Sequence, residues 1–297
     1  MAARSAWSPI ATRPMEEFIR ALGEHQFLRT ALVAGLLASL ACGVMGPFVV
    51  VKRIGYLAGG IAHTVLAGMG AALYFGFSPR LGAIGAAVGA ALLVGGVRLR
   101  WRTQEDTLIG ATWSVGMAVG ILFIAKTPGY ATDLMSYLFG NILLVPTSDL
   151  GFMLGMDLLL VLVVGLYFRQ FVAVAFDEEF ARLRGVPVSF FYLLLLCLVA
   201  ITLVLLIQVV GLILVIALLT LPAATAGFFV HSLGRMMLVS TLLGALLTSS
   251  GLALSYAPDL PPGPTIILLA GGTYLIAAFA HRTLARRRGK AQAGAHR

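Results

Sequence analysis

The chain has 297 residues, of which 60% are hydrophobic and only 11% are charged, whereas soluble domains carry about a quarter charged residues. So little polar surface excludes a water-soluble globular fold, and the bilayer is therefore the expected solvent. The net charge of +9 comes from Lys and Arg at the ends of apolar runs, which is typical of cytoplasmic loops and argues against nucleic-acid binding.

The first 27 residues form a separate N-terminal segment. They have mixed charge and no apolar centre, so no cleavable signal peptide is predicted. Residues 14–29 are predicted to form an amphipathic helix that lies on the membrane surface.

Residues 28–281 are a succession of apolar runs, each close to the roughly 20 residues that a helix needs to cross the hydrocarbon layer. The runs must be helical because lipid offers no partner to an unpaired backbone group. The sequence therefore predicts an all-α fold, a polytopic transmembrane helical bundle of nine spans, or of eight if one run is re-entrant. The runs cover residues 30–51, 56–77, 80–97, 108–126, 150–168, 189–208, 211–230, 236–257 and 264–281.

The distribution of Lys and Arg predicts which ends of the spans face the cytoplasm, because basic residues collect in cytoplasmic loops. The segments 127–149 and 257–263 are nearly free of them and are predicted to face outward. Nine spans place the N-terminus outside, which the arginines of the first 29 residues do not favour. The predicted cytoplasmic segments are 52–55, 98–107, 170–187 and 282–297, the last as a disordered basic tail.

Glycine is abundant, with 34 residues, and several recur at small-xxx-small spacing. Small faces let membrane helices approach closely where no hydrophobic force draws them together. The spacing therefore predicts a compact bundle. The clearest clusters are Gly59-Gly60, Gly68, Gly70 and Gly82, Gly85, Gly89.

Polar side chains within apolar runs are expensive, at about 2.5–3.5 kcal/mol for an ionisable residue at mid-span, so they are expected to face a cavity or a partner. His63 lies among glycine and alanine, and neutral imidazole is a ligand for zinc and similar metals. The alternative is a histidine that hydrogen-bonds a neighbouring carbonyl. Asp133 either caps a helix that begins at Leu134 or attracts cations at the outer mouth. Asn141 and Asp157 complete the polar set of possible pathway residues.

The segment between the fifth and sixth runs predicts a short cytoplasmic helix. Acids occupy its first turn and arginines its last, and Gly185 is placed to cap its C-terminus. Phe176, Phe180 and Leu183 recur at helical spacing, so they form an apolar stripe that docks on a partner or lies on the bilayer. The segment comprises Asp177, Glu178, Glu179, Phe180, Ala181, Arg182, Leu183 and Gly185.

In their order and spacing, these segments resemble the permease family of zinc- and manganese-type ABC importers over about residues 28–281. Each motif is weak alone, and together they are specific. The motifs cover residues 46–53, 60–63, 133–141, 177–185, 210–214 continuing into 221–226, and 262–264.

The resemblance implies a helical permease fold shared with cobalamin- and siderophore-type importers. It implies a homodimer in a prokaryotic cytoplasmic membrane, with ATPase subunits below, a metal-binding protein outside and a central pathway. The cargo is a divalent ion, zinc or manganese, and no cofactor is held stably. The resemblance also makes 177–185 the coupling helix, with Phe180 and Ala181 docking on the ATPase, and Pro222 is expected to kink its helix.

One position departs from the resemblance. Many family members have Asp four residues before the histidine, on the same helix face, and Gly59 stands there in this chain. Asp133 is a candidate substitute from another segment. His63 and Asp133 are therefore the expected contacts of the transported metal.

Other classes of protein fit less well. HExxH is absent, and the serines of 248–251 have no positioned base, which argues against an intramembrane enzyme. No GxxxxGK[ST] is present, so ATP hydrolysis is expected in a partner subunit. An ion-coupled secondary transporter needs a coupling site and often an inverted repeat, and neither is evident. The nearest alternative is a permease for iron, cobalamin or a siderophore-like chelate.

Overall fold

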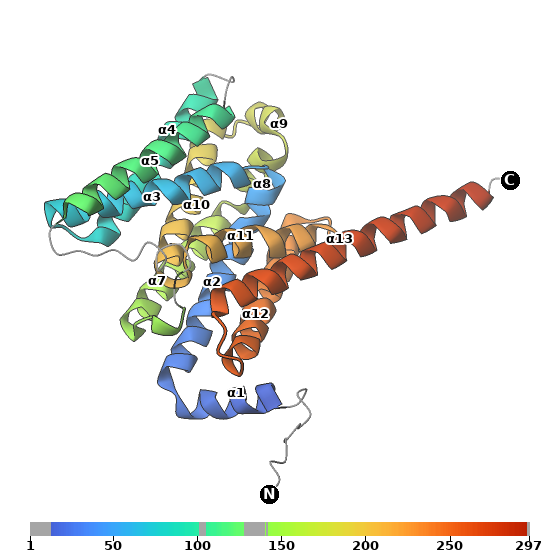
Figure 1. Ribbon diagram of the computed structural model, residues 1–297. Helices are drawn as coiled ribbons and strands as arrows, with labels where there is room; N and C mark the ends of the chain where they lie inside the picture. The colour runs from blue at the N-terminus through green and yellow to red at the C-terminus, as the bar shows by residue number, and fades with distance from the viewer. Residues whose placement is uncertain (1–12, 101–104, 128–139, 141, 296–297) are drawn as a thin grey trace, which may run out of the picture.

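The computed structural model describes residues 13–100, 105–127, 140 and 142–295, and the described part of the chain contains helices and no strand (Figure 1). The helices are α1 (Arg13–Glu24), α2 (Gln26–Val51), α3 (Gly55–Phe75), α4 (Pro79–Arg100), α5 (Glu105–Lys126), η1 (Ile142–Leu144), α7 (Thr147–Leu166), α8 (Phe168–Phe176), α9 (Glu178–Leu183), α10 (Val188–Val210), α11 (Leu212–Gly227), α12 (Leu233–Tyr256) and α13 (Pro262–Ala295).

The predicted spans are present as helices. Among the described residues, eight helices are long and apolar enough to cross a membrane. The ninth run forms α11, whose 16 residues give a length of about 24 Å, less than the roughly 30 Å hydrocarbon layer. The prediction of an all-α bundle of eight or nine spans is therefore confirmed.

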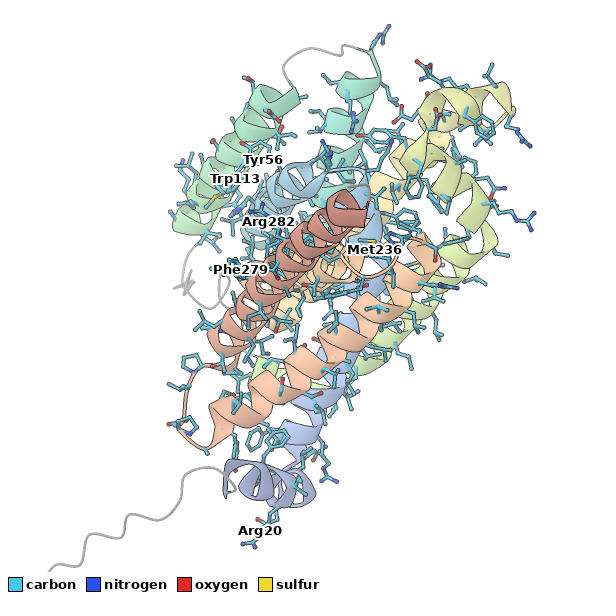
Figure 2. All side chains as sticks on the ribbon, turned by 90° about the vertical axis from the view of Figure 1, so that its right-hand side faces the viewer. Arg20, Tyr56, Trp113, Met236, Phe279 and Arg282 are labelled. Carbon is cyan, nitrogen blue, oxygen red and sulfur yellow. The ribbon has the colours of Figure 1, made fainter. Side chains whose placement is uncertain are left out.

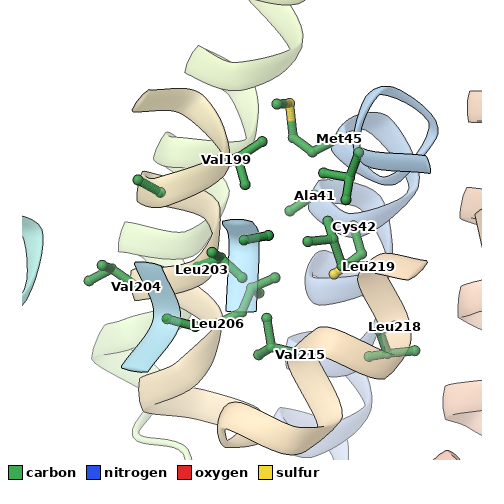
Figure 3. Close-up of a cluster of buried hydrophobic side chains, with 14 of the residues drawn as sticks. Ala41, Cys42, Met45, Val199, Leu203, Val204, Leu206, Val215, Leu218 and Leu219 are labelled. Carbon is green, nitrogen blue, oxygen red and sulfur yellow. The ribbon is translucent and has the colours of Figure 1, made fainter. Parts of the chain in front are cut away.

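Helix α2 is the centre of the bundle, and α7, α10, α11 and α12 pack against it. Figure 3 shows part of the core between them, where Met45 of α2, Leu203 of α10 and Leu219 of α11 approach one another and are almost completely buried. Two hydroxyl groups of α12 add polar links to α2. Ser240 donates to the Gly43 carbonyl at 2.8 Å, and the Thr248 and Ser39 hydroxyls lie 3.2 Å apart.

Helices α3, α4 and α5 form a second group beside this core (Figure 1). Glycine allows their close approach, as the small-residue spacing predicts. A side chain at Gly68 or Gly82 would collide with the backbone of the other, and a Cβ at Gly116 of α5 would lie 2.8 Å from Thr64 Cα of α3. The prediction does not extend to Gly85 and Gly89, because a Cβ there would meet no described residue within 4 Å.

Polar contacts between distant segments identify the two ends of the bundle. At one end, Lys52 after α2 pairs with Glu178 of α9, and Arg98 of α4 donates to the Tyr192 hydroxyl of α10. At the other, Arg80 of α4 pairs with Asp149 of α7 at 2.9 Å. The segments predicted to be cytoplasmic at residues 52–55, 98–100 and 170–187 thus lie together.

The N-terminal segment forms a helix, as predicted, whereas the C-terminal segment differs from the prediction. Phe18 of α1 packs edge-on against Tyr256 of α12 at 6.2 Å, so α1 lies at the bundle end predicted to face outward. Helix α13 continues to Ala295 and projects from the bundle (Figure 1), where a disordered tail is predicted from Arg282. Ala, Arg, Lys and Gln dominate this tail, and all are strong helix formers.

Candidate pathway residues and the predicted coupling helix

His63 lies on α3, half-buried, with one face of its ring covered. Its imidazole stacks on the indole of Trp113 from α5, with 4.1 Å between ring centroids and 12° between ring planes. Neither imidazole nitrogen has a hydrogen-bond partner among the described residues, whereas Thr64 beside it donates to the Gly60 carbonyl at 2.8 Å. The alternative of a histidine satisfied by a nearby carbonyl therefore finds no support in this part of the chain.

Trp113 lies against several residues along α3. Tyr56, two turns before His63, lies 6.1 Å from the same indole, and Figure 2 shows Tyr56 and Trp113 beside each other on facing helices. Between them, a Cβ at Gly59 would lie 3.9 Å from the indole, which is ordinary contact distance. Gly59, the position at which the resemblance implies an Asp, thus faces an aromatic ring.

Acidic partners for His63 are not found in the ranges that the structure describes, and no group of three or more His, Cys, Asp or Glu residues there is arranged to hold a metal ion. Asp133 and Asn141, the other predicted pathway residues, lie outside the described residues. The grouping of His63 with Asp133 therefore stays a prediction.

Asp157 lies near the middle of α7 with only 3% of its surface exposed. Its Oδ2 atom has no hydrogen-bond partner within the described part of the chain. Because α7 packs against α2, Asp157 is a polar group buried inside the bundle.

The short helix predicted at 177–185 is present as α9, with a defined cap at each end. The Asp177 side chain accepts from the backbone N–H groups of Glu179 and Phe180 at 3.0 and 2.9 Å. Gly185 has φ +75°, where glycine is favoured, and the next N–H, of Val186, donates to the Ala181 carbonyl at 3.0 Å. These caps explain how six residues hold a helix.

The outer face of α8 and α9 is apolar and exposed. Phe176, Phe180 and Leu183 have 63%, 49% and 86% of their surface exposed. Ala181, expected to dock together with Phe180, instead has none, because it lies on the opposite side of the helix turn and packs into the chain's own core. The surface available to a partner is therefore formed by Phe176, Phe180 and Leu183, which we call the α9 apolar face.

The other side of α9 is tied to the bundle through charged groups. The Lys52 ammonium pairs with Glu178 and lies 5.7 Å above the ring of Tyr192. The Arg98 guanidinium lies 4.9 Å from the centre of the same ring and donates to the tyrosine hydroxyl at 2.7 Å. Tyr192 is only 1% exposed. This cluster of Lys52, Glu178, Tyr192 and Arg98 connects α9 to α2, α4 and α10.

Pro222 lies within α11, is buried, and does not end the helix, which continues to Gly227. The junction before α11 is tight. Gly211 has φ +82°, and a side chain on Gly140 would collide with its backbone. Gly140 therefore lies against the α10–α11 junction, and Ile142 of η1 is buried in the bundle.

Comparison with known proteins agrees with this arrangement. Residues 24–281, which include both the His63 stack and α9, match the ABC 3 transport family. The chain belongs to this family. It is accordingly a multi-pass protein of the cell membrane and a membrane subunit of an ABC transporter, and the predicted resemblance is confirmed.

Relatives in this family align along nearly their whole length. The chain is 44% identical over 253 residues to a probable metal transport system membrane protein of Chlamydia pneumoniae, covering 83% of this chain and 86% of the relative. It is 32% identical over 265 residues to the manganese import system permease protein ScaB of Streptococcus gordonii, covering 89% and 95%. The solved structure of PsaBC from Streptococcus pneumoniae in complex with Fab superposes with a TM-score of 0.80 at 33% identity, covering 88% and 94%.

Sequence reasoning missed Trp113 and Tyr192 in this ABC 3 family chain. Trp113 stands between Gly110 and Gly116 in an apolar run. A large ring on a helix face of small residues was the signal in the sequence that could have identified it. Tyr192 follows Pro187 by only five residues and carried no local sign of its two cationic neighbours. Both residues act through partners on other helices, which the sequence of one helix does not disclose.

Proposed function

We propose that this chain is the permease subunit of an ATP-driven importer that moves a divalent metal ion, zinc or manganese, into the cell. The observation that carries the proposal is the α9 apolar face, presented on a capped helix at the predicted cytoplasmic end of an ABC-family bundle. The names of the relatives support a metal as cargo, because they describe metal and manganese transport.

A separate ATPase subunit is the partner of the α9 apolar face. Three large apolar side chains on two short helices are costly to leave in water, at about 25 cal/mol for each Å² of apolar surface. Burying them in a groove of a second protein removes that cost, as in other helix-in-groove interfaces. The charged cluster behind α9 then passes the movement of the docked helix to α2, α4 and α10.

His63 is the proposed contact of the metal inside the membrane. Its nitrogens lie at the edge of a ring whose face is occupied by Trp113, so they remain free for an ion. One imidazole per chain is a weak site, and a weak site suits transport because a closed set of ligands would retain the ion. In a homodimer, two such imidazoles and water complete the contact, and Asp133 concentrates cations at the outer mouth.

The remaining partner is an external metal-binding protein that delivers the ion to the outward end of the bundle. The described part of this end contains the Arg80–Asp149 pair and the α12–α13 connection. We expect the delivery protein to determine which ions reach the pathway, because the permease itself binds weakly.

Uptake by the reconstituted complex tests the proposal. Vesicles with permease, its ATPase and the delivery protein should accumulate Zn²⁺ or Mn²⁺ only with ATP, and the purified permease alone should hydrolyse none. His63→Ala should reduce uptake by about a hundredfold, as loss of a metal ligand does, while expression and ATPase assembly are retained. His231→Ala is the matched control, because His231 is exposed and lies on the connection between α11 and α12. Uptake of a metal chelate and not of free ions, or wild-type kinetics for His63→Ala, would contradict the proposal.

A further inference from the structure

The residues around His63 bear on which metal the pathway favours. The imidazole and the indole of Trp113 are nearly parallel at 4.1 Å. A ring stacked on a neighbour keeps its plane, whereas an isolated half-buried imidazole rotates about its side-chain bonds. Because imidazole binds metals in its own plane through a ring nitrogen, fixing the plane also fixes the direction from which an ion is bound.

The packing of α3 on α5 leaves the indole little freedom. A Cβ on Gly116, one turn beyond Trp113, would lie 2.8 Å from Thr64 Cα, so the two backbones come close together beside the stack. On the α3 side, the indole lies against Gly59, where only a hydrogen stands in place of a side chain. The ring of Tyr56 lies 6.1 Å from the same indole. Trp113 is therefore held by the same close contacts that hold the two helices together.

The printed ring contact of the imidazole is with an aromatic side chain, that of Trp113. In the described ranges, no carboxylate or thiolate joins His63 in a group able to hold a metal. Imidazole suits zinc, copper, iron and nickel, whereas manganese prefers carboxylate, carbonyl and water oxygens. The imidazole presents a nitrogen, and Gly59 one turn before it on the same helix face supplies no carboxylate, which favours zinc and similar ions over manganese.

We propose that Trp113 is a positioning residue for His63, and that the stacked pair gives the pathway a preference for zinc-class ions over manganese. This inference rests on the proposed function, because it assigns an ion preference to the same His63. It is distinct from that function, since a permease that favoured manganese would still be a metal permease.

Fluorescence of Trp113 directly tests whether a metal ion binds to the His63 that is stacked on it. The chain has three tryptophans, so Trp7→Phe with Trp101→Phe leaves Trp113 as the only one in the full-length protein. In lipid nanodiscs, Zn²⁺ should change its emission saturably, at a concentration about tenfold lower than Mn²⁺ requires. His63→Ala in the same background should remove the Zn²⁺ response. An equal or stronger response to Mn²⁺, or a Zn²⁺ response that survives His63→Ala, would overturn the inference.

Substitutions of Trp113 separate positioning from general packing. In the reconstituted complex, Trp113→Leu should raise the KM for Zn²⁺ about tenfold with little change in kcat, as loss of a residue that orients a ligand does. Trp113→Phe keeps a planar ring against the imidazole and should restore most of the affinity. A KM for Trp113→Leu equal to that of the wild type would refute positioning. A fall in kcat alone, shared by both variants, would show a packing role and also refute it.

Gly59 offers a gain-of-function test of the ion preference. A Cβ at Gly59 has only the indole within 4 Å, and the position is one helical turn from His63, so an added carboxylate fits on the same face. Gly59→Asp should shift the ratio of Zn²⁺ to Mn²⁺ uptake about tenfold toward Mn²⁺. The isosteric Gly59→Asn should leave the ratio near that of the wild type.

Failure of the proposed function and failure of the ion preference give different results. If the wild-type complex takes up neither ion, the proposed function fails. If it takes up metal and the ratio is the same for Gly59→Asp, Gly59→Asn and the wild type, only the preference assigned here is wrong.

Discussion

The region around α9 and the region around His63 are held together by different forces. At α9, Lys52, Glu178 and Arg98 meet around a buried tyrosine at the end of the bundle, so charge connects four helices. At His63, the contacts are a stacked ring and glycine, deep in an apolar span. The two regions therefore suit different roles. Strong polar contacts at α9 can transmit movement, and the apolar surroundings of His63 bind an ion weakly enough to let it pass.

The largest expected effect comes from removing the docking surface of α9. Phe180→Asp places a charge at the centre of the α9 apolar face, where burying it against the ATPase costs several kcal/mol. We expect ATP-dependent uptake to fall by at least roughly a hundredfold, because each 1.4 kcal/mol is a factor of ten in binding. Co-purification of the ATPase with the permease, measured beside uptake, shows whether the loss is one of assembly.

Phe180→Leu is the control for this variant, because it keeps an apolar side chain at the same position. It should retain most of the uptake and all of the membrane insertion. Wild-type uptake by Phe180→Asp would show that the α9 apolar face lies on the bilayer. The proposal that α9 transmits movement from the ATPase would then be wrong.

A smaller effect is expected from reversing the charges behind α9. Lys52→Glu alone sets two acids against each other, with the side chain of residue 52 only 8% exposed and that of Glu178 32% exposed. Loss of the pair should cost about 1–3 kcal/mol and reduce uptake several-fold, while the ATPase still binds the exposed face. Lys52→Glu combined with Glu178→Lys should recover part of the loss. A double variant no better than the sum of its single changes would show that the pair does not couple α9 to α2.

The sequence predicted more of the α9 region than of the His63 region, because the signals at α9 are local. The acids after Phe176 and Gly185 are local signals, since caps and dipole interactions act within a few residues, and they indicated both ends of α9. Ala181 was misplaced because six residues do not define which face of a short helix packs inward. The spans were predictable from hydropathy, because lipid requires helices.

The interior of the candidate site was predictable only in part. His63 was identified because an ionisable group in a span is costly and therefore informative. Its neighbour Trp113 was not, because which helices meet depends on long-range packing of small residues. Tyr192 was missed for the same reason. The unpaired oxygen of Asp157 also depends on the packing of α2 against α7, which no local pattern reveals.

The smallest effect is expected from Asp157, a carboxyl within the membrane-spanning part of α7. Glu178 is paired with Lys52, whereas the carboxyl of Asp157 is unpaired at its Oδ2 among the described residues. Only 3% of the surface of Asp157 is exposed. A buried charge without a partner is unfavourable, so the carboxylate is expected to lower the stability of the fold. Asp157→Asn keeps the shape and removes the charge. We expect it to raise the free energy of unfolding by about 1 kcal/mol and to change uptake less than twofold.

Thermal unfolding of the detergent-solubilised chain measures the first effect, and vesicle uptake measures the second. Asp149→Asn is the matched control on the same helix, because Asp149 pairs with Arg80 at 2.9 Å and should gain nothing from losing its charge. If Asp157→Asn reduces uptake tenfold with unchanged stability, Asp157 contacts the ion in another conformation of the bundle. The metal path would then include a carboxylate as well as His63, and the contrast between a charged α9 region and an uncharged pathway would not hold.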